Sequence, residues 1–327
     1  MTNRTGLKIM FIPGLTLPAM ADEDLDRIRR AAGADAQVVV CDYPSAEEHI
    51  EDVDALLGII GQKLFSRARR LKWVQSISSG VDSFMYPEFI NSPVILTSEK
   101  GLVGEHLADH SFGLLLMLTR KLAAAHDLGA AAWQHRPELR ADEIELTGRT
   151  MGILGLGGTG RAMARRALAF GMQVIALDRD PVAGMAGVDL VIGQDQLEEF
   201  LAATDVLAVC CPLTSETNNL LDSANLARLK PGAFLINVTR GEIMVEEALV
   251  EHLRSGHLRG AGLDVAPREP LPADSALWQL PNVVMSPHTA GASQFRAQRN
   301  IDRFVSNLEK FVAGEPLDGI IDKTLGY

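Results

Sequence analysis

The amino-acid sequence predicts an α/β protein built from two doubly wound domains, each with a parallel sheet covered by helices. Its 327 residues are material for about two domains of ordinary size. Short apolar runs alternate with amphipathic stretches, a pattern that is typical of parallel strands joined by crossover helices. The alternation occurs as two separate series, at residues 8–97 and 150–285, with a long helical stretch between them.

Composition and charge exclude several classes of function. The chain has 31 Lys and Arg against 42 Asp and Glu, so its net charge of −11 repels nucleic acids and anionic membranes. Cys41, Cys210 and Cys211 form no framework of spaced pairs, and no apolar run approaches the roughly 20 residues that span a bilayer. We therefore expect a cytoplasmic protein that acts on a small molecule, with no nucleic-acid or membrane partner.

The first series predicts five strands, at 8–12, 37–41, 55–60, 73–77 and 94–97. Residues 104–122 then follow a 3.6-residue period, which predicts one long helix that bridges the domains. The next segment, 130–146, is polar and contains Trp133, and we expect Pro137 to break it. It is interpreted as an excursion over the surface or into a partner.

The second series predicts seven strands, at 150–154, 173–177, 188–192, 206–210, 233–238, 260–264 and 283–285. A final helix is predicted over 292–313, because Ile301, Phe304 and Leu308 lie on one apolar stripe. Gly314 is a suitable stop signal for this helix.

A glycine-rich turn follows the first strand of the second series and precedes a helix. Gly155, Gly157 and Gly160 form the pattern G-x-G-x-x-G, in which they permit a tight turn, close approach to a pyrophosphate and close helix packing. This context predicts a Rossmann dinucleotide-binding unit. The next strand ends at Asp178, 23 residues after Gly155, where a carboxylate accepts ribose hydrogen bonds and repels a 2′-phosphate. We expect NAD rather than NADP, although the neighbouring Arg179 is suited to a phosphate.

Three later segments carry residue types that suit hydride chemistry with a nicotinamide cofactor. Arg240 follows a predicted strand, and its guanidinium fork matches a carboxylate. His288 follows another strand, and histidine exchanges protons near neutral pH. Glu269 lies between them, where a carboxylate would orient the imidazole and pair with its charged form. Each residue alone has an ordinary structural explanation, but this order after a dinucleotide turn predicts catalysis.

Together these motifs resemble the D-isomer-specific 2-hydroxyacid dehydrogenases. The resemblance runs through 71–82, 104–110, the glycine-rich turn, 211–214, the Arg240 segment, 264–270 and 287–291, and only about the first seventy residues match loosely. It implies a Rossmann cofactor domain, 103–291, inserted in a flavodoxin-like substrate domain made of 1–102 and 292–327. It also implies a cleft between the domains and a homodimer.

The resemblance further implies a role for individual residues. His288 would protonate the carbonyl oxygen of a 2-keto acid as hydride arrives from NADH, Glu269 would hold His288, and Arg240 would bind the carboxylate. The loop Ser79, Gly80 and Val81 would bind the same carboxylate through backbone N–H groups. Asp264 would touch the nicotinamide carboxamide. The residues expected at the cofactor are Gly155, Gly157, Gly158, Thr159, Gly160, Asp178, Arg179, Cys211, Pro212, Thr239, Asp264 and His288.

Two other functions stay open at this point. One is an NADP-dependent glyoxylate or hydroxypyruvate reductase, and the other is a non-enzymatic NAD(H) sensor, since some proteins that resemble this family are corepressors. The presence of Arg240, Glu269 and His288 together favours an enzyme. His106 and His110 have the i, i+4 spacing of a metal-binding helix, but Asp109 stands where the zinc-peptidase motif has Glu, so no metal is expected.

Overall fold

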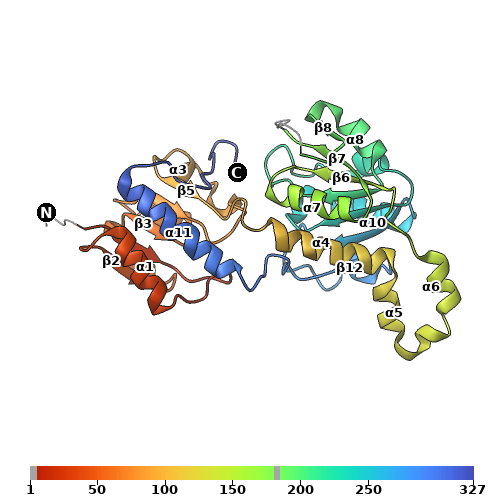
Figure 1. Ribbon diagram of the computed structural model, residues 1–327, viewed down its shortest axis with the longest axis horizontal. Coiled ribbons are helices and arrows are strands. Elements are labelled where there is room, and N and C mark those ends of the chain that lie inside the picture. Colours follow the sequence, from red (N-terminus) through yellow and green to blue (C-terminus); the bar gives the residue numbers. More distant parts are fainter. Residues whose placement is uncertain (1–5, 180–184) are drawn as a thin grey trace. The chain divides into compact units, whose positions relative to one another are not determined.

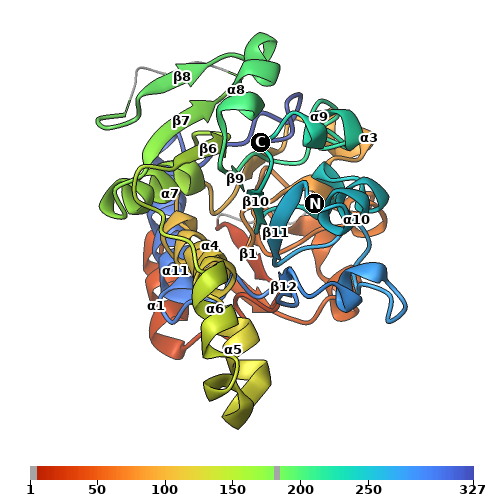
Figure 2. The same ribbon diagram turned by 90° about the vertical axis from the view of Figure 1, so that its right-hand side faces the viewer.

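The computed structural model describes residues 6–179 and 185–327, which form two compact units. One comprises the chain up to Val103 together with Ala292–Tyr327, and the other comprises Gly104–Gly291. We call them the five-stranded unit and the seven-stranded unit. Each is a parallel sheet with helices on both faces (Figures 1 and 2), so the predicted class of two doubly wound sheets is confirmed.

The five-stranded unit has the strand order β2-β1-β3-β4-β5, which is the order of flavodoxin-like folds. Every pair of neighbouring strands is parallel. The strands are shorter than predicted but lie inside the predicted ranges: β1 (Lys8–Phe11), β2 (Gln37–Val40), β3 (Ala55–Leu57), β4 (Trp73–Gln75) and β5 (Ile95–Thr97).

Helices α1 (Asp22–Ala32) and α11 (Arg296–Ala313) lie side by side on one face of this sheet (Figure 1). The opposite face is covered by α2 (Gln62–Phe65) and α3 (Pro87–Ile90), and short 3-10 helices connect the strands: η1 (Ser45–Glu48), η2 (Ile50–Asp52) and η3 (Asp82–Phe84). Successive strand residues point to opposite faces, so Leu57 packs with Phe304 of α11 while Leu56 packs with Phe89 of α3. Burial on both faces explains the continuous apolar runs.

The final helix begins at Arg296, four residues later than the predicted residue 292. It ends where predicted, because Gly314 adopts φ +71 and its N–H bonds back to the last turn.

The seven-stranded unit has the order β12-β11-β10-β9-β6-β7-β8. Numbered within the unit, this is the Rossmann arrangement with one additional edge strand, β12. All seven predicted strands are present, and every neighbouring pair is parallel. They are β6 (Thr150–Leu154), β7 (Gln173–Leu177), β8 (Leu190–Ile192), β9 (Val206–Val209), β10 (Ala233–Asn237), β11 (Leu258–Leu263) and β12 (Val283–Met285).

Two layers of helices cover this second sheet. On one face α4 (Gly104–Thr119) and α7 (Gly158–Ala169) pack against residues such as Ile153 and Ile236. On the other face α8 (Leu197–Ala203), α9 (Ser223–Ala227) and α10 (Glu246–Arg254) pack against residues such as Leu207 and Leu235. The connecting 3-10 helices are η5 (Gln194–Gln196), η6 (Gly241–Ile243) and η7 (Ala276–Gln279).

An arm leaves the end of α4 (Figures 1 and 2) and consists of α5 (Leu122–Leu128), η4 (Gly129–Trp133) and α6 (Arg136–Asp142). The helix predicted to run to residue 122 ends at Thr119, because Lys121 adopts φ +55. The prediction that Pro137 breaks the following segment is wrong, since this proline lies in the first turn of α6, where no N–H is needed. No residue of the arm, all of which is described, is buried.

Among the described residues, no helix is both long and apolar enough to cross a lipid bilayer.

Candidate active site

The predicted cofactor and catalytic residues follow successive strands of the seven-stranded unit. The glycine-rich turn follows β6, Asp178 follows β7, Cys211 comes after β9, Arg240 after β10, and His288 after β12. All these strands are parallel, so their carboxyl ends lie along one edge of the sheet. This is the edge at which open α/β sheets bind ligands.

The glycine-rich turn has the shape that a dinucleotide requires. Gly155 adopts φ +96, and a Cβ there would lie 2.8 Å from the Cα of Cys211. A Cβ at Gly160 would lie 2.1 Å from the carbonyl oxygen of Gly155, so only glycine lets α7 approach the turn. By contrast, apart from Gly157 itself and its two neighbours in the chain, no described atom lies within 4 Å of the place where a Cβ of Gly157 would stand. That open side, at the N-terminus of α7, fits a pyrophosphate.

Two side chains border this turn. One carboxylate oxygen of Asp178, Oδ2, accepts a hydrogen bond from the main-chain N–H of Leu156 at 2.7 Å, which fixes the acid beside the turn. Burial raises the pKa of the Cys211 thiol to about 12, so this residue meets the turn as a neutral thiol. Arg179, also predicted at the cofactor, directly precedes residues 180–184, which the structure does not describe.

Arg240 is held by the last residue of β10. The buried Asn237 side chain accepts hydrogen bonds from the N–H and the hydroxyl of Thr239, both at 3.0 Å, and its amide donates to the carbonyl of Arg240 at 2.8 Å. A Cβ at Gly241 would lie 1.9 Å from the carbonyl carbon of Ala266. The Arg240 segment therefore packs directly against the loop that leads to Glu269.

Glu269 and His288 form a hydrogen-bonded pair. Glu269 Oε1 accepts the N–H of Ala266 at 3.1 Å, and its Oε2 lies 2.7 Å from His288 Nδ1. Since a carboxylate only accepts, Nδ1 carries the hydrogen, and Nε2 is the nitrogen left to face a substrate. The side chain of His288 is 45% exposed and that of Glu269 is 38% exposed, so a small molecule can reach them.

The predicted carboxylate loop belongs to the five-stranded unit, where it follows β4. The Ser78 hydroxyl donates to the carbonyl of Gly80 at 2.8 Å and thereby folds the loop. Within the described residues, the N–H groups of Ser79, Gly80 and Val81 donate to no protein acceptor. Three consecutive donors without a protein partner are suited to an anion.

Comparison with known proteins assigns the family. The model of the D-isomer specific 2-hydroxyacid dehydrogenase NAD-binding domain matches residues 112–290, more than half of the chain. The chain belongs to this family. It is therefore a 2-hydroxyacid dehydrogenase, an oxidoreductase that transfers hydride between a 2-hydroxy acid and the corresponding 2-keto acid with an NAD(P) cofactor.

Individual relatives of the dehydrogenase agree with this assignment. It is 34% identical over 280 residues to a glyoxylate reductase of Korarchaeum cryptofilum, which covers 82% of both chains. A D-isomer specific 2-hydroxyacid dehydrogenase family protein of Aeromonas salmonicida superposes with a TM-score of 0.81 at 31% identity, over 98% of this chain and 100% of the other. An NADPH-dependent glyoxylate/hydroxypyruvate reductase of Sinorhizobium meliloti, solved with NADP and sulfate, gives 0.79 at 27% identity over 98% and 100%.

Asp264 of the dehydrogenase is fully buried and heavily bonded. Its carboxylate accepts the Ser286 hydroxyl at 2.6 Å and the N–H groups of Thr289 and Ala290 at 2.9 and 2.8 Å. A carboxylate has about four acceptor sites, so these bonds occupy most of them. Sequence reasoning did not identify Ser286, which bonds Asp264, or Asn237, which holds the Arg240 segment. The only sequence signal for these two residues is their position at or just after a strand end.

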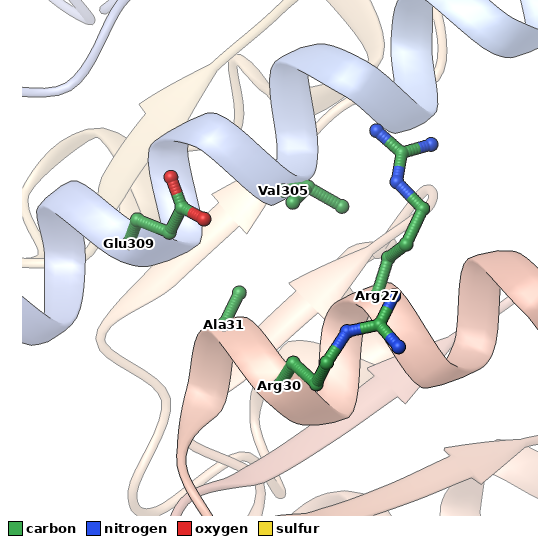
Figure 3. A pocket seen from close by; sticks show the side chains of 5 residues that line it. All are labelled: Arg27, Arg30, Ala31, Val305 and Glu309. Atoms are coloured by element: carbon green, nitrogen blue, oxygen red, sulfur yellow. The ribbon is translucent and has the colours of Figure 1, made fainter.

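The five-stranded unit has a hollow on its surface. It lies between α1 and α11 and is lined by Arg27, Arg30, Ala31, Val305 and Glu309 (Figure 3). Arg27 is already paired with Asp302 at 2.7 Å. None of the candidate site residues lines this hollow.

Proposed function

We propose that this dehydrogenase reduces a 2-keto acid to the D-2-hydroxy acid with NADH, and that His288 is its general acid. The observation that carries the proposal is the 2.7 Å contact between Glu269 Oε2 and His288 Nδ1. It keeps a hydrogen on Nδ1 and fixes the ring orientation, so that Nε2 faces away from Glu269. In the imidazolium form Nε2 also carries a proton, and this is the proton that His288 donates. The same pair works in the reverse direction, in which Nε2 takes the hydroxyl proton.

The bound cofactor would supply hydride to C2 of the keto acid. The protein's part is to deliver the proton: as the carbonyl π bond breaks, its oxygen would take the proton from His288 Nε2. Glu269 balances the charge of the imidazolium before transfer. Arg240 is proposed to bind the substrate carboxylate. The N–H groups of Ser79, Gly80 and Val81 are themselves suited to a carboxylate.

The names of relatives suggest the first substrates. Glyoxylate reductases and glyoxylate/hydroxypyruvate reductases are about one third identical to this chain. The test measures oxidation of NADH and NADPH with glyoxylate, hydroxypyruvate, pyruvate and phenylpyruvate. We expect His288→Ala to lower kcat about 100- to 10,000-fold. His252→Ala is the matched control, because this histidine lies in α10 and bonds the Ser223 carbonyl at 3.0 Å.

A kcat in His288→Ala close to that of the unaltered protein would contradict the proposal. If NADH binds but the unaltered protein reduces no keto acid, the sensor function gains support instead.

Preference for NADH over NADPH is proposed on Asp178, whose carboxylate is fixed beside the glycine-rich turn. Asp178→Ala should raise the ratio of kcat/KM for NADPH to that for NADH. The control is Asp189→Ala, because Asp189 also accepts a main-chain N–H, at 3.0 Å, but precedes β8 and so lies at the other edge of the sheet. An unchanged ratio in Asp178→Ala, or a native preference for NADPH, would contradict this proposal.

We propose a homodimer because of the arm α5–α6. All residues of the arm are described, and none of them is buried within its own chain. Trp133 is 80% exposed and Leu122 54%, so the arm presents apolar surface that a second copy would cover. Sedimentation velocity should give a dimer that Trp133→Asp weakens, and a monomer at micromolar concentration would contradict the proposal.

A cytoplasmic location is supported by the free thiols of Cys41, Cys210 and Cys211.

A further inference from the structure

A chain of three polar side chains links helix α4 to the segment that carries His288. His110 Nε2 lies 2.7 Å from the Ser286 hydroxyl oxygen, and that hydroxyl lies 2.6 Å from Asp264 Oδ1. The Asp264 carboxylate in turn accepts the main-chain N–H groups of Thr289 and Ala290. His110 belongs to the H-x-x-D-H pattern, which has no role in the proposed catalytic site. Asp109 of the same pattern takes no part in this chain of bonds, and it accepts a hydrogen bond from Arg166 at 2.6 Å.

The direction of each hydrogen bond follows from the chemistry of the groups. The Asp264 carboxylate can only accept, so the single hydrogen of the Ser286 hydroxyl points to it. The Ser286 oxygen then has only lone pairs left for His110. His110 Nε2 must therefore carry a hydrogen and donate it to Ser286, which sets the tautomer of this imidazole.

His288 needs this support because its backbone conformation is unusual. Its φ is +53, in the left-handed region that residues other than glycine rarely adopt. Its N–H donates to the carbonyl of Asp264 at 2.7 Å, and the next two N–H groups donate to the Asp264 carboxylate. Asp264 thus fixes the main chain on three consecutive residues, and the aim of the imidazole depends on it.

We propose that His110 is a positioning residue for His288 and acts through Ser286 and Asp264. By donating to Ser286, it holds the hydroxyl on Asp264 and keeps that carboxylate in the place from which it binds the main chain at 288–290. The inference rests on the proposed role of His288 as general acid. It concerns the aim of His288 rather than substrate binding, so the effect belongs in kcat and not in the KM for the keto acid.

The kinetic test compares His110→Phe, which keeps a ring but cannot donate, with His110→Gln, whose amide N–H can donate to Ser286. We expect His110→Phe to lower kcat about 10- to 100-fold, the size of the loss when hydrogen bonds that orient metal-binding histidines are removed, with the keto-acid KM within about twofold. His110→Gln should recover most of the loss. Ser286→Ala combined with His110→Phe should cost little more than either alone, because the residues act in series.

His252→Phe is the matched control, because that histidine lies outside the chain of bonds. An unchanged kcat in His110→Phe, a change in KM alone, or equal losses in His110→Phe and His110→Gln would overturn the inference. If the unaltered protein reduces no keto acid, the proposed function fails on its own.

A second measurement then still tests the positioning network. In nitrogen-15 imidazole spectra at neutral pH, we expect His110 as the Nε2–H tautomer, and Ser286→Ala should shift the main-chain amide signals of Thr289 and Ala290. The Nδ1–H tautomer, or unshifted amide signals, would contradict the network whatever the activity is.

Discussion

Replacement of Asn237 by Leu tests how the Arg240 segment is built. Asn237 is fully buried and makes three hydrogen bonds, two from Thr239 and one to the carbonyl of Arg240. Leucine has nearly the same volume but can make none of them. The Thr239 N–H and the Arg240 carbonyl lose their partners, and at about 1–3 kcal/mol for each unsatisfied group the expected loss of stability is about 2–6 kcal/mol.

The same change should loosen the guanidinium that we place on the substrate carboxylate. Misplacement of such a group by an ångström costs roughly 10- to 100-fold in kcat/KM, so we expect the keto-acid KM to rise in the folded variant. The assay is urea unfolding followed by steady-state kinetics. Asn282→Leu is the matched control, because Asn282 precedes β12 and its side chain makes one bond, at 3.2 Å to the Leu253 carbonyl. Equal stabilities for the two variants, or an unchanged KM in Asn237→Leu, would refute the reasoning.

Three further predictions concern stability and reactivity. Arg296→Met strips the buried Glu99 of its ion-pair partner and should cost about 3–5 kcal/mol in urea unfolding. Glu99→Leu in the double variant removes the unpaired charge and should restore part of this loss, because the buried Asn300 amide then loses its bond to Glu99. Equal losses in the single and double variants would count against this. Burial alone would raise the pKa of Asp205, but bonds from the Thr150 N–H and Lys230 lower it below its unfolded value. Its stabilisation is thus present above the unfolded pKa and lost as pH falls through the folded pKa, so Asp205→Asn should flatten the acid side of the stability curve, and an unaltered curve would argue otherwise. The Cys211 thiol, whose pKa burial raises to about 12, should resist iodoacetamide at neutral pH until the protein unfolds, and rapid labelling of the folded protein would be inconsistent with that environment.

The strands could be predicted from the sequence because burial on both faces makes each of them a continuous apolar run. Leu56 and Leu57 face opposite helix layers, and both are buried. The arm could not be predicted as helix, because none of the residues of α5 and α6 is buried, so these helices have no apolar stripe. The domain boundaries predicted from the sequence lie at 102/103 and 291/292. The two compact units of the structure divide at 103/104 and 291/292.

The candidate site divides in the same way. The glycine-rich turn is a local motif, so spacing alone predicts Gly155, Gly160 and the strand-end Asp178. The partners of Asp264 are not local, since His110 and Ser286 are 176 residues apart in sequence and meet only in the folded sheet. In the sequence Asn237 is an ordinary residue at the end of a predicted strand. Nothing in the sequence indicates that its side chain forms hydrogen bonds with Thr239 and Arg240 of the loop that follows.

The most direct test of the central claim is NADH oxidation by the purified protein with a panel of 2-keto acids, measured beside His288→Ala and His252→Ala. We predict turnover with at least one small keto acid, a loss of about 100- to 10,000-fold in His288→Ala, and no loss in His252→Ala. Full activity in His288→Ala would contradict the assignment of His288 as the proton donor.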